Sequence, residues 1–273
     1  MSLASLARSH AANHLGAVRD HLFGVKTAFA AGHAGYDDAR VFIDKDCHGW
    51  GQDTNRWKKV VNLAGPASKL KPMSMGSPGI RYAEVERETK ETKVQVVLDL
   101  DGGTRQDVDT GIGFLDHMLK LMSFHGSFDL GVSCEGDLRV EDHHTVEDVG
   151  IVLGQAFKKA LDGSHGLVRY ASNHTPMDDA LVIVAVDISG RGYLVYEVPF
   201  KRESLGALHT ENICEFFQAF AINSGITIHI HKITGVNDHH VCEAIFKGMG
   251  RALHAATLHG DRKAVNSTKG VVG

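Results

Sequence analysis

The clearest pattern of hydrophobic positions is a run of β-branched and aliphatic residues that occurs twice in the chain. Residues 93–102 read KVQVVLDLDG and residues 181–190 read LVIVAVDISG, so each run ends in a glycine-containing turn. Runs of this length and composition, bounded by turn residues, are typical of β-strands. The sequence after each strand also repeats, which predicts two similar units of roughly 95 residues each.

Each unit continues with the same order of predicted elements. A second strand, a helical stretch and a third strand lead to the tripeptide Asp-His-His, and a further helical pattern follows at Val149–Leu161 and at Ala244–Leu253. We therefore expect an α+β fold of two fused β-β-α-β-α repeats, with the helices packed on one face of each sheet. No G-x-G-x-x-G or Walker glycine loop occurs, so nothing in the sequence supports a nucleotide-binding fold.

The first 78 residues differ from the two repeats. They contain both tryptophans and little periodicity, and their last part is rich in Gly, Pro and Ser, which is typical of a linker. Residues 2–30 are rich in Ala, Leu and His and contain a single acidic residue, which fits either an amphipathic targeting segment or a non-catalytic extension. We predict three regions: an extension with a linker at 1–78, a first repeat at 79–172, and a second repeat with a C-terminal tail at 173–273.

The overall composition excludes several classes of protein. The chain has 273 residues, 43% of them hydrophobic, and a formal net charge of -4. Such a chain can bury a sizeable core, and its near-balanced charge argues against a general nucleic-acid binder. No apolar run approaches the ~18 residues needed to cross a bilayer. The scattered cysteines are expected to be free thiols of a reducing compartment: Cys47, Cys134, Cys214 and Cys242.

Histidine is unusually frequent, with 18 residues, and two segments, DHHTVE at 142–147 and DHHVCE at 238–243, concentrate it. If each segment begins a helix, a His and a Glu three or four residues apart share one face and can bind one metal ion, whereas adjacent histidines point about 100° apart. The leading Asp would be an N-cap or would accept a hydrogen bond from an imidazole N–H. The duplicated motif predicts two metal ions held by residues of different motifs or subunits, and its candidate ligands are His143, His144, Glu147, His239, His240 and Glu243.

A third histidine accompanies the two motifs. His117, in the segment GIGFLDHML, is expected on a buried apolar face of the helix that precedes the first motif, and its counterpart in the second repeat is Glu215. Nitrogen-rich sites with one carboxylate suit manganese, iron or zinc, and these residue types leave all three metals open.

The segments RETKET, DTGIGFLDHML, EDHHTVEDVG, NDHHVCEAIFKG and STKG together resemble imidazoleglycerol-phosphate dehydratase, over about residues 80–270. The resemblance implies two Mn²⁺ ions per subunit and a large hollow homo-oligomer of about 24 subunits with sites between subunits. It also implies a small phosphate ester as substrate, with no nucleic-acid or membrane partner. We expect a cytoplasmic protein, or a plastid one if the extension is a transit peptide.

The reaction implied by this resemblance is the loss of water from imidazole-glycerol phosphate, which gives imidazole-acetol phosphate in histidine biosynthesis. The departing proton lies on an unactivated carbon, a difficulty that a Lewis-acidic metal and a carboxylate base would overcome. The resemblance implies Glu243 as the acid–base group, assisted by Glu147 and His117, and a metal-binding role for the motif residues, for His117 and for Glu215. It implies substrate contacts by Glu91, His125, Arg169, Arg191, Lys247, Ser267 and Lys269.

The chain departs from the family pattern at three positions. Glu215 stands where plant-type members have His, Cys214 where they have Glu, and Leu121 where some relatives have Gln. Two other functions stay open on the motifs alone. A dinuclear phosphoesterase would hydrolyse generic phosphate esters, and a non-catalytic metal-binding protein would exchange metal without turnover.

Overall fold

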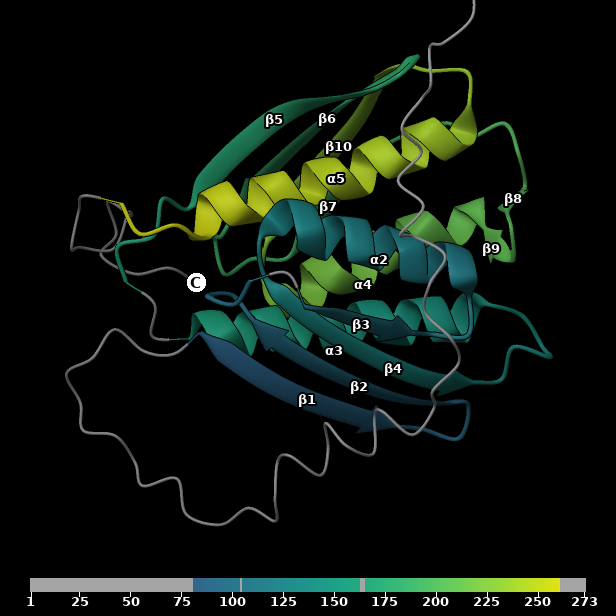
Figure 1. Cartoon of the computed structure of the whole chain (residues 1–273), viewed down its shortest axis with the longest axis horizontal. Coiled ribbons are helices and arrows are strands. Elements are labelled where there is room, and N and C mark those ends of the chain that lie inside the picture. The colour runs from purple at the N-terminus through teal and green to yellow at the C-terminus, as the bar shows by residue number, and fades with distance from the viewer. Residues whose placement is uncertain (1–80, 104, 163–164, 261–273) are drawn as a thin grey trace, which may run out of the picture. The chain divides into compact units, whose positions relative to one another are not determined.

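The fold consists of two similar repeats, as the repeated sequence pattern predicts. The computed structural model describes residues 81–260 except 104, 163 and 164 (Figure 1). The chain divides into two units, Met1–Lys71 and Pro72–Gly273, and all described residues belong to the second. The predicted extension at 1–78 and the tail residues Ser267 and Lys269 lie outside the described residues.

Each repeat contains one four-stranded sheet. The strand orders are β1-β2-β4-β3 and β5-β6-β10-β7, and in each sheet only the last pair of strands is parallel. A helix precedes β4 and β10, which supplies the crossover that a parallel pair needs. The strand bounds are β1 Tyr82–Glu88, β2 Thr92–Asp99, β3 Gln106–Asp109, β4 Asp129–Gly136, β5 Tyr170–Met177, β6 Ala180–Asp187, β7 Tyr193–Glu197 and β10 Thr227–Thr234.

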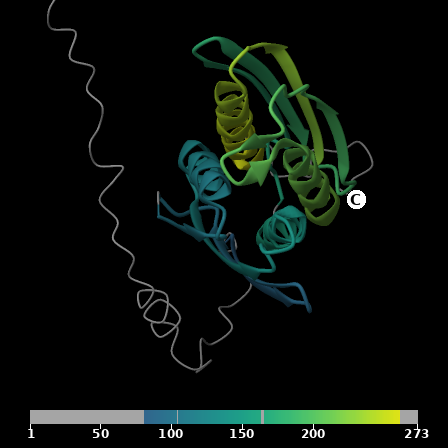
Figure 2. The same cartoon turned by 90° about the vertical axis from the view of Figure 1, so that its right-hand side faces the viewer.

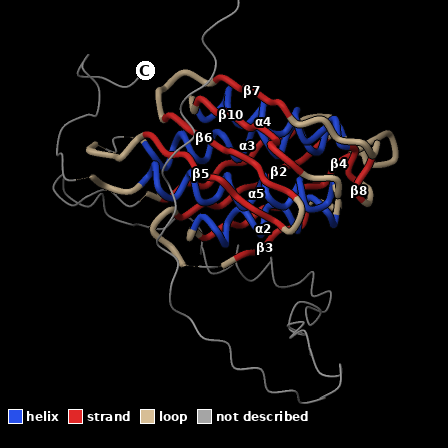
Figure 3. Tube along the Cα trace, turned by 90° about the horizontal axis from the view of Figure 1, so that it is seen from above, coloured by secondary structure: helices blue, strands red, loops and turns tan. Residues whose placement is uncertain are grey.

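Four helices form the inner layers between the two sheets (Figure 2). They are α2 (Gly113–Gly126), α3 (His143–Leu161), α4 (Thr210–Ser224) and α5 (Asp238–Thr257). Each sheet is covered on one face by the helices of its own repeat, and seen from above its strands run across them (Figure 3). The predicted fold class, with two repeats and helices on one face of each sheet, is confirmed.

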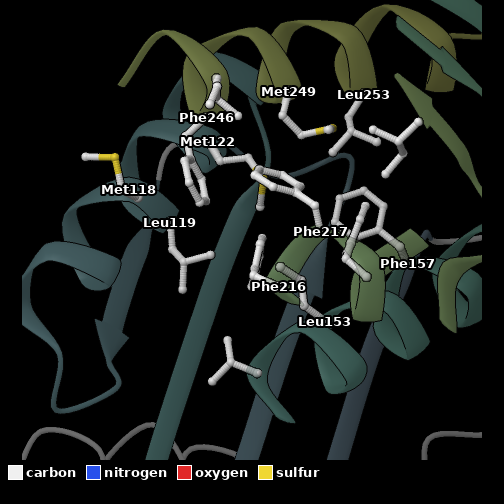
Figure 4. Close-up of a cluster of buried hydrophobic side chains, with 14 of the residues drawn as sticks. Met118, Leu119, Met122, Leu153, Phe157, Phe216, Phe217, Phe246, Met249 and Leu253 are labelled. Atoms are coloured by element: carbon white, nitrogen blue, oxygen red, sulfur yellow. The ribbon is translucent and has the colours of Figure 1, made fainter. Parts of the chain in front are cut away.

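The core lies where the helices of one repeat meet those of the other, α3 against α4 and α2 against α5. Aromatic side chains fill the centre (Figure 4), where the Phe157 and Phe220 rings meet edge-on with centroids 5.3 Å apart. Each such ring, fully buried, contributes about 1.5–3 kcal/mol relative to an exposed one. The two repeats therefore share one core.

The structure adds one strand to each predicted repeat, which gives the order β-β-β-α-β-α. The added strands, β1 and β5, lie at sheet edges and read YAEVERE and YASNHTPM. Edge strands need few apolar residues because one side and one face stay in water, so they give a weak hydrophobic signal. The predicted boundary at 172/173 falls inside β5, so the second repeat begins at or before Tyr170.

The connection before α4 is the main difference between the repeats. In the first repeat three residues join β3 to α2, whereas in the second repeat residues 198–209 join β7 to α4 and contain the short strands β8 (Ser204–Leu205) and β9 (Leu208–His209). Among the described residues no helix is long and apolar enough to span a lipid bilayer. The described cysteines are free thiols: Cys134, Cys214 and Cys242.

Glycines at the shared core allow the helices to approach closely, so a larger residue there should lower the stability of the protein. A Cβ at Gly250 of α5 would lie 2.2 Å from the Met122 carbonyl oxygen of α2, whereas a Cβ at Gly113 would meet nothing within 4 Å. We expect Gly250→Ala to lower the free energy of unfolding by about 2–3 kcal/mol because the helices must separate. Thermal unfolding of both variants tests this, and an unchanged midpoint for Gly250→Ala relative to the Gly113→Ala control would contradict it.

Candidate active site

Both Asp-His-His segments lie at helix starts, as their spacing predicts. His143 begins α3 and Asp238 begins α5, where Asn237 caps the helix by accepting a hydrogen bond from the His239 backbone N–H at 3.0 Å. Asp142 occupies the cap position of α3 but forms no capping hydrogen bond. Of the two roles predicted for the motif aspartates, helix capping is therefore wrong, whereas acceptance from an imidazole N–H is confirmed for Asp142, which pairs with the His209 ring.

The two motif aspartates instead hold the 198–209 connection. The Asp142 carboxylate accepts hydrogen bonds from the backbone N–H and ring Nδ1 of His209, at 2.8 and 2.6 Å. Asp238 Oδ2 accepts from the backbone N–H groups of Lys201 and Arg202, both at 2.8 Å. Burial alone would raise the pKa of Asp142, but its hydrogen bonds outweigh burial and lower it.

The first histidine of each motif faces the glutamate one turn later. His143 Nε2 lies 3.8 Å from Glu147 Oε2, and His239 Nε2 lies 2.9 Å from Glu243 Oε1. The neighbouring histidine rings are nearly perpendicular, at 79° in the first motif and 85° in the second. Adjacent histidines therefore point to different places, as the helical geometry predicts.

Glu243 is the centre of the most tightly connected cluster. Its Oε1 lies 3.3 Å from His117 Nε2, and its Oε2 accepts a hydrogen bond from Lys247 Nζ at 2.6 Å. Burial raises the pKa of Glu243, but the hydrogen bonds from Lys247, His239 and His117 outweigh burial and lower the pKa to about 2. Glu243 is thus a carboxylate at physiological pH.

The surroundings of His117 differ from the sequence prediction. The side chain is 49% exposed, not buried on an apolar face, because it lies where α2 passes the start of α5. His125 lies further along α2, where burial and the cations Lys247 and Arg251 lower its pKa. The structure therefore brings His117, His125, His239, Glu243 and Lys247 to one region.

The second histidine of each motif binds an aspartate through Nδ1. His144 Nδ1 lies 3.1 Å from Asp137 Oδ2, and His240 Nδ1 lies 2.7 Å from Asp179 Oδ1. Carboxylates accept only from a protonated nitrogen, so each Nδ1 carries hydrogen and Nε2 can act as an acceptor. Nε2 of His240 lies 3.3 Å from the side-chain amide nitrogen of Asn237. The hydrogen bond to Asp137 raises the pKa of His144.

A carboxylate from the turn between the first two strands also faces each of these histidines. Glu91 Oε1 lies 3.9 Å from His144 Nε2, and Asp178 Oδ2 lies 3.5 Å from His240 Nε2. The predicted substrate residue Glu91 thus lies beside the first motif. Sequence reasoning missed Asp137, Asp178 and Asp179, since acidic residues in turns are common and only folding places them against histidines.

These donor atoms suit a divalent metal ion, although they are not gathered around one point. Within the described parts of 81–260, no group of three or more His, Cys, Asp or Glu side chains is placed to hold a metal ion. Around Glu243 the two imidazoles instead hydrogen-bond to the same carboxylate oxygen. The Glu215 side chain is exposed and forms no hydrogen bond or ion pair with another described residue, so its ligand role stays a prediction.

The predicted phosphate-binding arginines lie at the other end of the second sheet. Arg169 pairs with Asp187 through a 2.8 Å Nε–Oδ1 bond, and its backbone N–H donates to the carbonyl of Ala256. Ala256 lies thirteen residues beyond Glu243 in α5, which is about 20 Å along the helix. Arg191 follows β6 at the same end and is exposed, with Nη1 3.4 Å from the Ser189 carbonyl oxygen. One chain therefore does not bring these arginines together with Glu243.

Comparisons with known proteins identify the family of the chain. The family model described as imidazoleglycerol-phosphate dehydratase matches residues 110–253. The enzyme of that name from Caldicellulosiruptor bescii is 54% identical over 195 residues, which are 71% of this chain and 100% of that protein. The one from Clostridium botulinum is 53% identical over 192 residues, 70% of this chain and 98% of that protein.

Solved structures with this description are similar as well. The dehydratase from Staphylococcus aureus superposes with a TM-score of 0.60 at 38% identity, covering 66% of this chain and 99% of that one. The protein from Pyrococcus furiosus gives a TM-score of 0.59 at 38% identity, covering 68% and 99%. On the strength of the two-repeat fold, the duplicated histidine motif and relatives matched over their full length, the chain belongs to the imidazoleglycerol-phosphate dehydratase family, the hydro-lyases of histidine biosynthesis.

Proposed function

We propose that the chain dehydrates imidazole-glycerol phosphate with two Mn²⁺ ions per subunit, at sites formed between copies of the chain in a large homo-oligomer. The main support for metal dependence is that His144 and His240, one from each motif, form hydrogen bonds through Nδ1 to Asp137 and Asp179. Hydrogen bonds of this kind fix the tautomer of metal-ligating histidines in proteins. Their Nε2 atoms and the neighbouring glutamates form a nitrogen-rich donor set that suits Mn²⁺.

The two metal ions would be held by different combinations of the motif residues. One set of ligands is His143 and Glu147, with Glu215 as a further candidate, and the other set is His239, Glu243 and His117. His144 and His240 point away from these sets and would reach the ions of neighbouring subunits. When bound, a divalent ion supplies a Lewis acid and a template for the imidazole ring.

The two motif glutamates differ in their surroundings. Glu243 is 8% exposed and is contacted by Lys247, His239 and His117, whereas the Glu147 side chain is 45% exposed and lies 3.8 Å from His143 Nε2. Both carboxylates can bind a cation, and Glu243, assisted by Glu147, is the proposed acid–base group.

Cations bind the phosphate end of the substrate. Arg191 is exposed and presents a guanidinium, whose planar donors suit a phosphate dianion. Since Arg169 bonds to Ala256, about 20 Å along α5 from Glu243, and Arg191 lies at the same end of the sheet, a site that uses both ends needs a second copy. A closed symmetric oligomer repeats such a contact at every subunit.

Removal of the metal tests the cofactor. Protein treated with a chelator should lose dehydratase activity, and added Mn²⁺ should restore it, because the ion supplies the Lewis acid. Formation of imidazole-acetol phosphate measures the activity, and hydrolysis of p-nitrophenyl phosphate serves as a control for a generic phosphoesterase. Full activity in protein shown to be metal-free would contradict the proposed cofactor.

Substitution of the metal-binding candidates tests the site. His144→Ala and Glu243→Ala should each reduce kcat by at least about 100-fold without changing the fold, because each removes a ligand. His174→Ala, on an exposed part of β5, is the matched control and should keep its activity. Wild-type turnover in either ligand variant would refute the assignment.

Mixed oligomers test whether the site lies between subunits. Arg191→Ala and Glu243→Ala should each be inactive alone, since each removes one half of the site. Co-expressed chains should recover up to roughly a quarter of the sites, because each half is intact in half of the chains. Activity no higher than that of the two separate variants, in mixed oligomers confirmed by mass spectrometry, would show that the two halves act within one chain.

A further inference from the structure

The two metal-ligand motifs differ in what contacts their first histidine. His143 Nδ1 lies 3.1 Å from the side-chain oxygen of Asn212, which is 3% exposed and belongs to α4. The corresponding ring, His239, instead meets the edge of Phe114 of α2, with centroids 5.3 Å apart at 64°. Among the described residues, His239 Nδ1 has no hydrogen-bond partner.

Asn212 and Phe114 occupy equivalent positions in the two repeats. Asn212 lies 98 residues after Phe114, the same separation as between His117 and its counterpart Glu215. Each residue lies near the start of the helix that packs against its motif helix, α4 against α3 and α2 against α5. The same position therefore supplies an amide to one motif and a phenyl ring to the other.

The orientation of the Asn212 amide is determined by Asp142. The Asp142 carboxylate is 5% exposed, and the Asn212 side chain beside it helps to lower its pKa. Because a carboxylate only accepts, the Asn212 NH₂ group faces Asp142 and its oxygen faces His143. His209 completes the arrangement, since its backbone N–H and its Nδ1 donate to the other side of Asp142.

This chain of hydrogen bonds fixes the tautomer of His143. An oxygen acceptor at Nδ1 requires Nδ1–H, which leaves Nε2 unprotonated and directed toward Glu147, 3.8 Å away. Phe114 offers His239 no acceptor, so the tautomer and rotation of that ring depend on Glu243 alone.

We infer that Asn212, held by Asp142, is a positioning residue that fixes the His143 ring for metal binding, and that the two metal sites of the chain are therefore inequivalent. The inference rests on the proposed metal function. Loss of an outer hydrogen-bond partner of a ligating histidine weakens metal binding by 10–100-fold in other proteins, so the effect should be confined to the site that contains His143.

Mn²⁺ binding to the metal-stripped full-length protein tests the inference. Electron paramagnetic resonance of free Mn²⁺ gives the affinity of each class of site without reference to turnover. We expect Asn212→Leu to weaken one class by roughly 10–100-fold and to leave the other unchanged. Phe114→Leu is the matched control at the equivalent position, and it should not weaken the class that Asn212→Leu weakens.

A double substitution separates positioning from loss of packing. Asp142→Asn/Asn212→Asp exchanges the amide and the carboxylate, so position 212 still accepts from His143 Nδ1 and position 142 still accepts from the His209 N–H. It should restore most of the affinity lost in Asn212→Leu. The inference is supported if Asn212→Leu weakens Mn²⁺ binding at one class of site only and the double variant recovers that affinity.

Three results would overturn it. Unchanged affinities in Asn212→Leu would show that the hydrogen bond does not position His143, and equal weakening of both classes would show general damage to the fold. A double variant as weak as Asn212→Leu would show that packing, not the hydrogen bond, matters. Failure of the proposed metal dependence is distinguishable, because the unaltered protein would then bind no Mn²⁺, and failure of the proposed reaction would appear as Mn²⁺ binding without dehydratase activity.

Discussion

The contact between the helices of one repeat and those of the other is the interaction on which the rest of the structure depends. Each sheet has one covered face, and the helices that cover it must bury their own outer sides as well. They do so against each other, α3 on α4 and α2 on α5, through fully buried Phe157, Phe216 and Phe246. Neither repeat could bury these side chains alone, so the chain folds as a pair of repeats.

The same packing of helices places both Asp-His-His motifs at the interface between the two repeats. The motif at the start of α3 meets Asn212 of α4, and the motif at the start of α5 meets His117 of α2. Each motif therefore takes part of its surroundings from the other repeat. Helix starts suit this purpose, because the helix keeps a His and the Glu one turn later on one face while its end stays open to ligands.

The 198–209 connection forms hydrogen bonds with the leading aspartate of both motifs. Its first part donates backbone hydrogen bonds to Asp238, and its last residue donates to Asp142. Both carboxylates are almost completely buried, at 2% and 5% exposure, and buried carboxylates left without partners would be strongly destabilising. The leading Asp of each motif is thus best understood as an anchor for this connection.

The repeat, the fold class and the two His-Glu pairs can be predicted from local periodicity, which is the alternation in β2 and β6 and the four-residue spacing in a helix. The edge strands β1 and β5 cannot, because their few apolar residues give little signal. Which side chains surround the motifs depends on how separate elements pack in three dimensions. Asp137, Asp179 and Asn212 act on histidines through contacts that no local pattern encodes. Arg169 lies far from Glu243 because its backbone N–H bonds to Ala256, about 20 Å further along α5, and Arg191 lies at the same end of the sheet. The spacing of residues along the chain determines which side chains share one face of a helix or strand. The packing of separate elements determines which other side chains they contact.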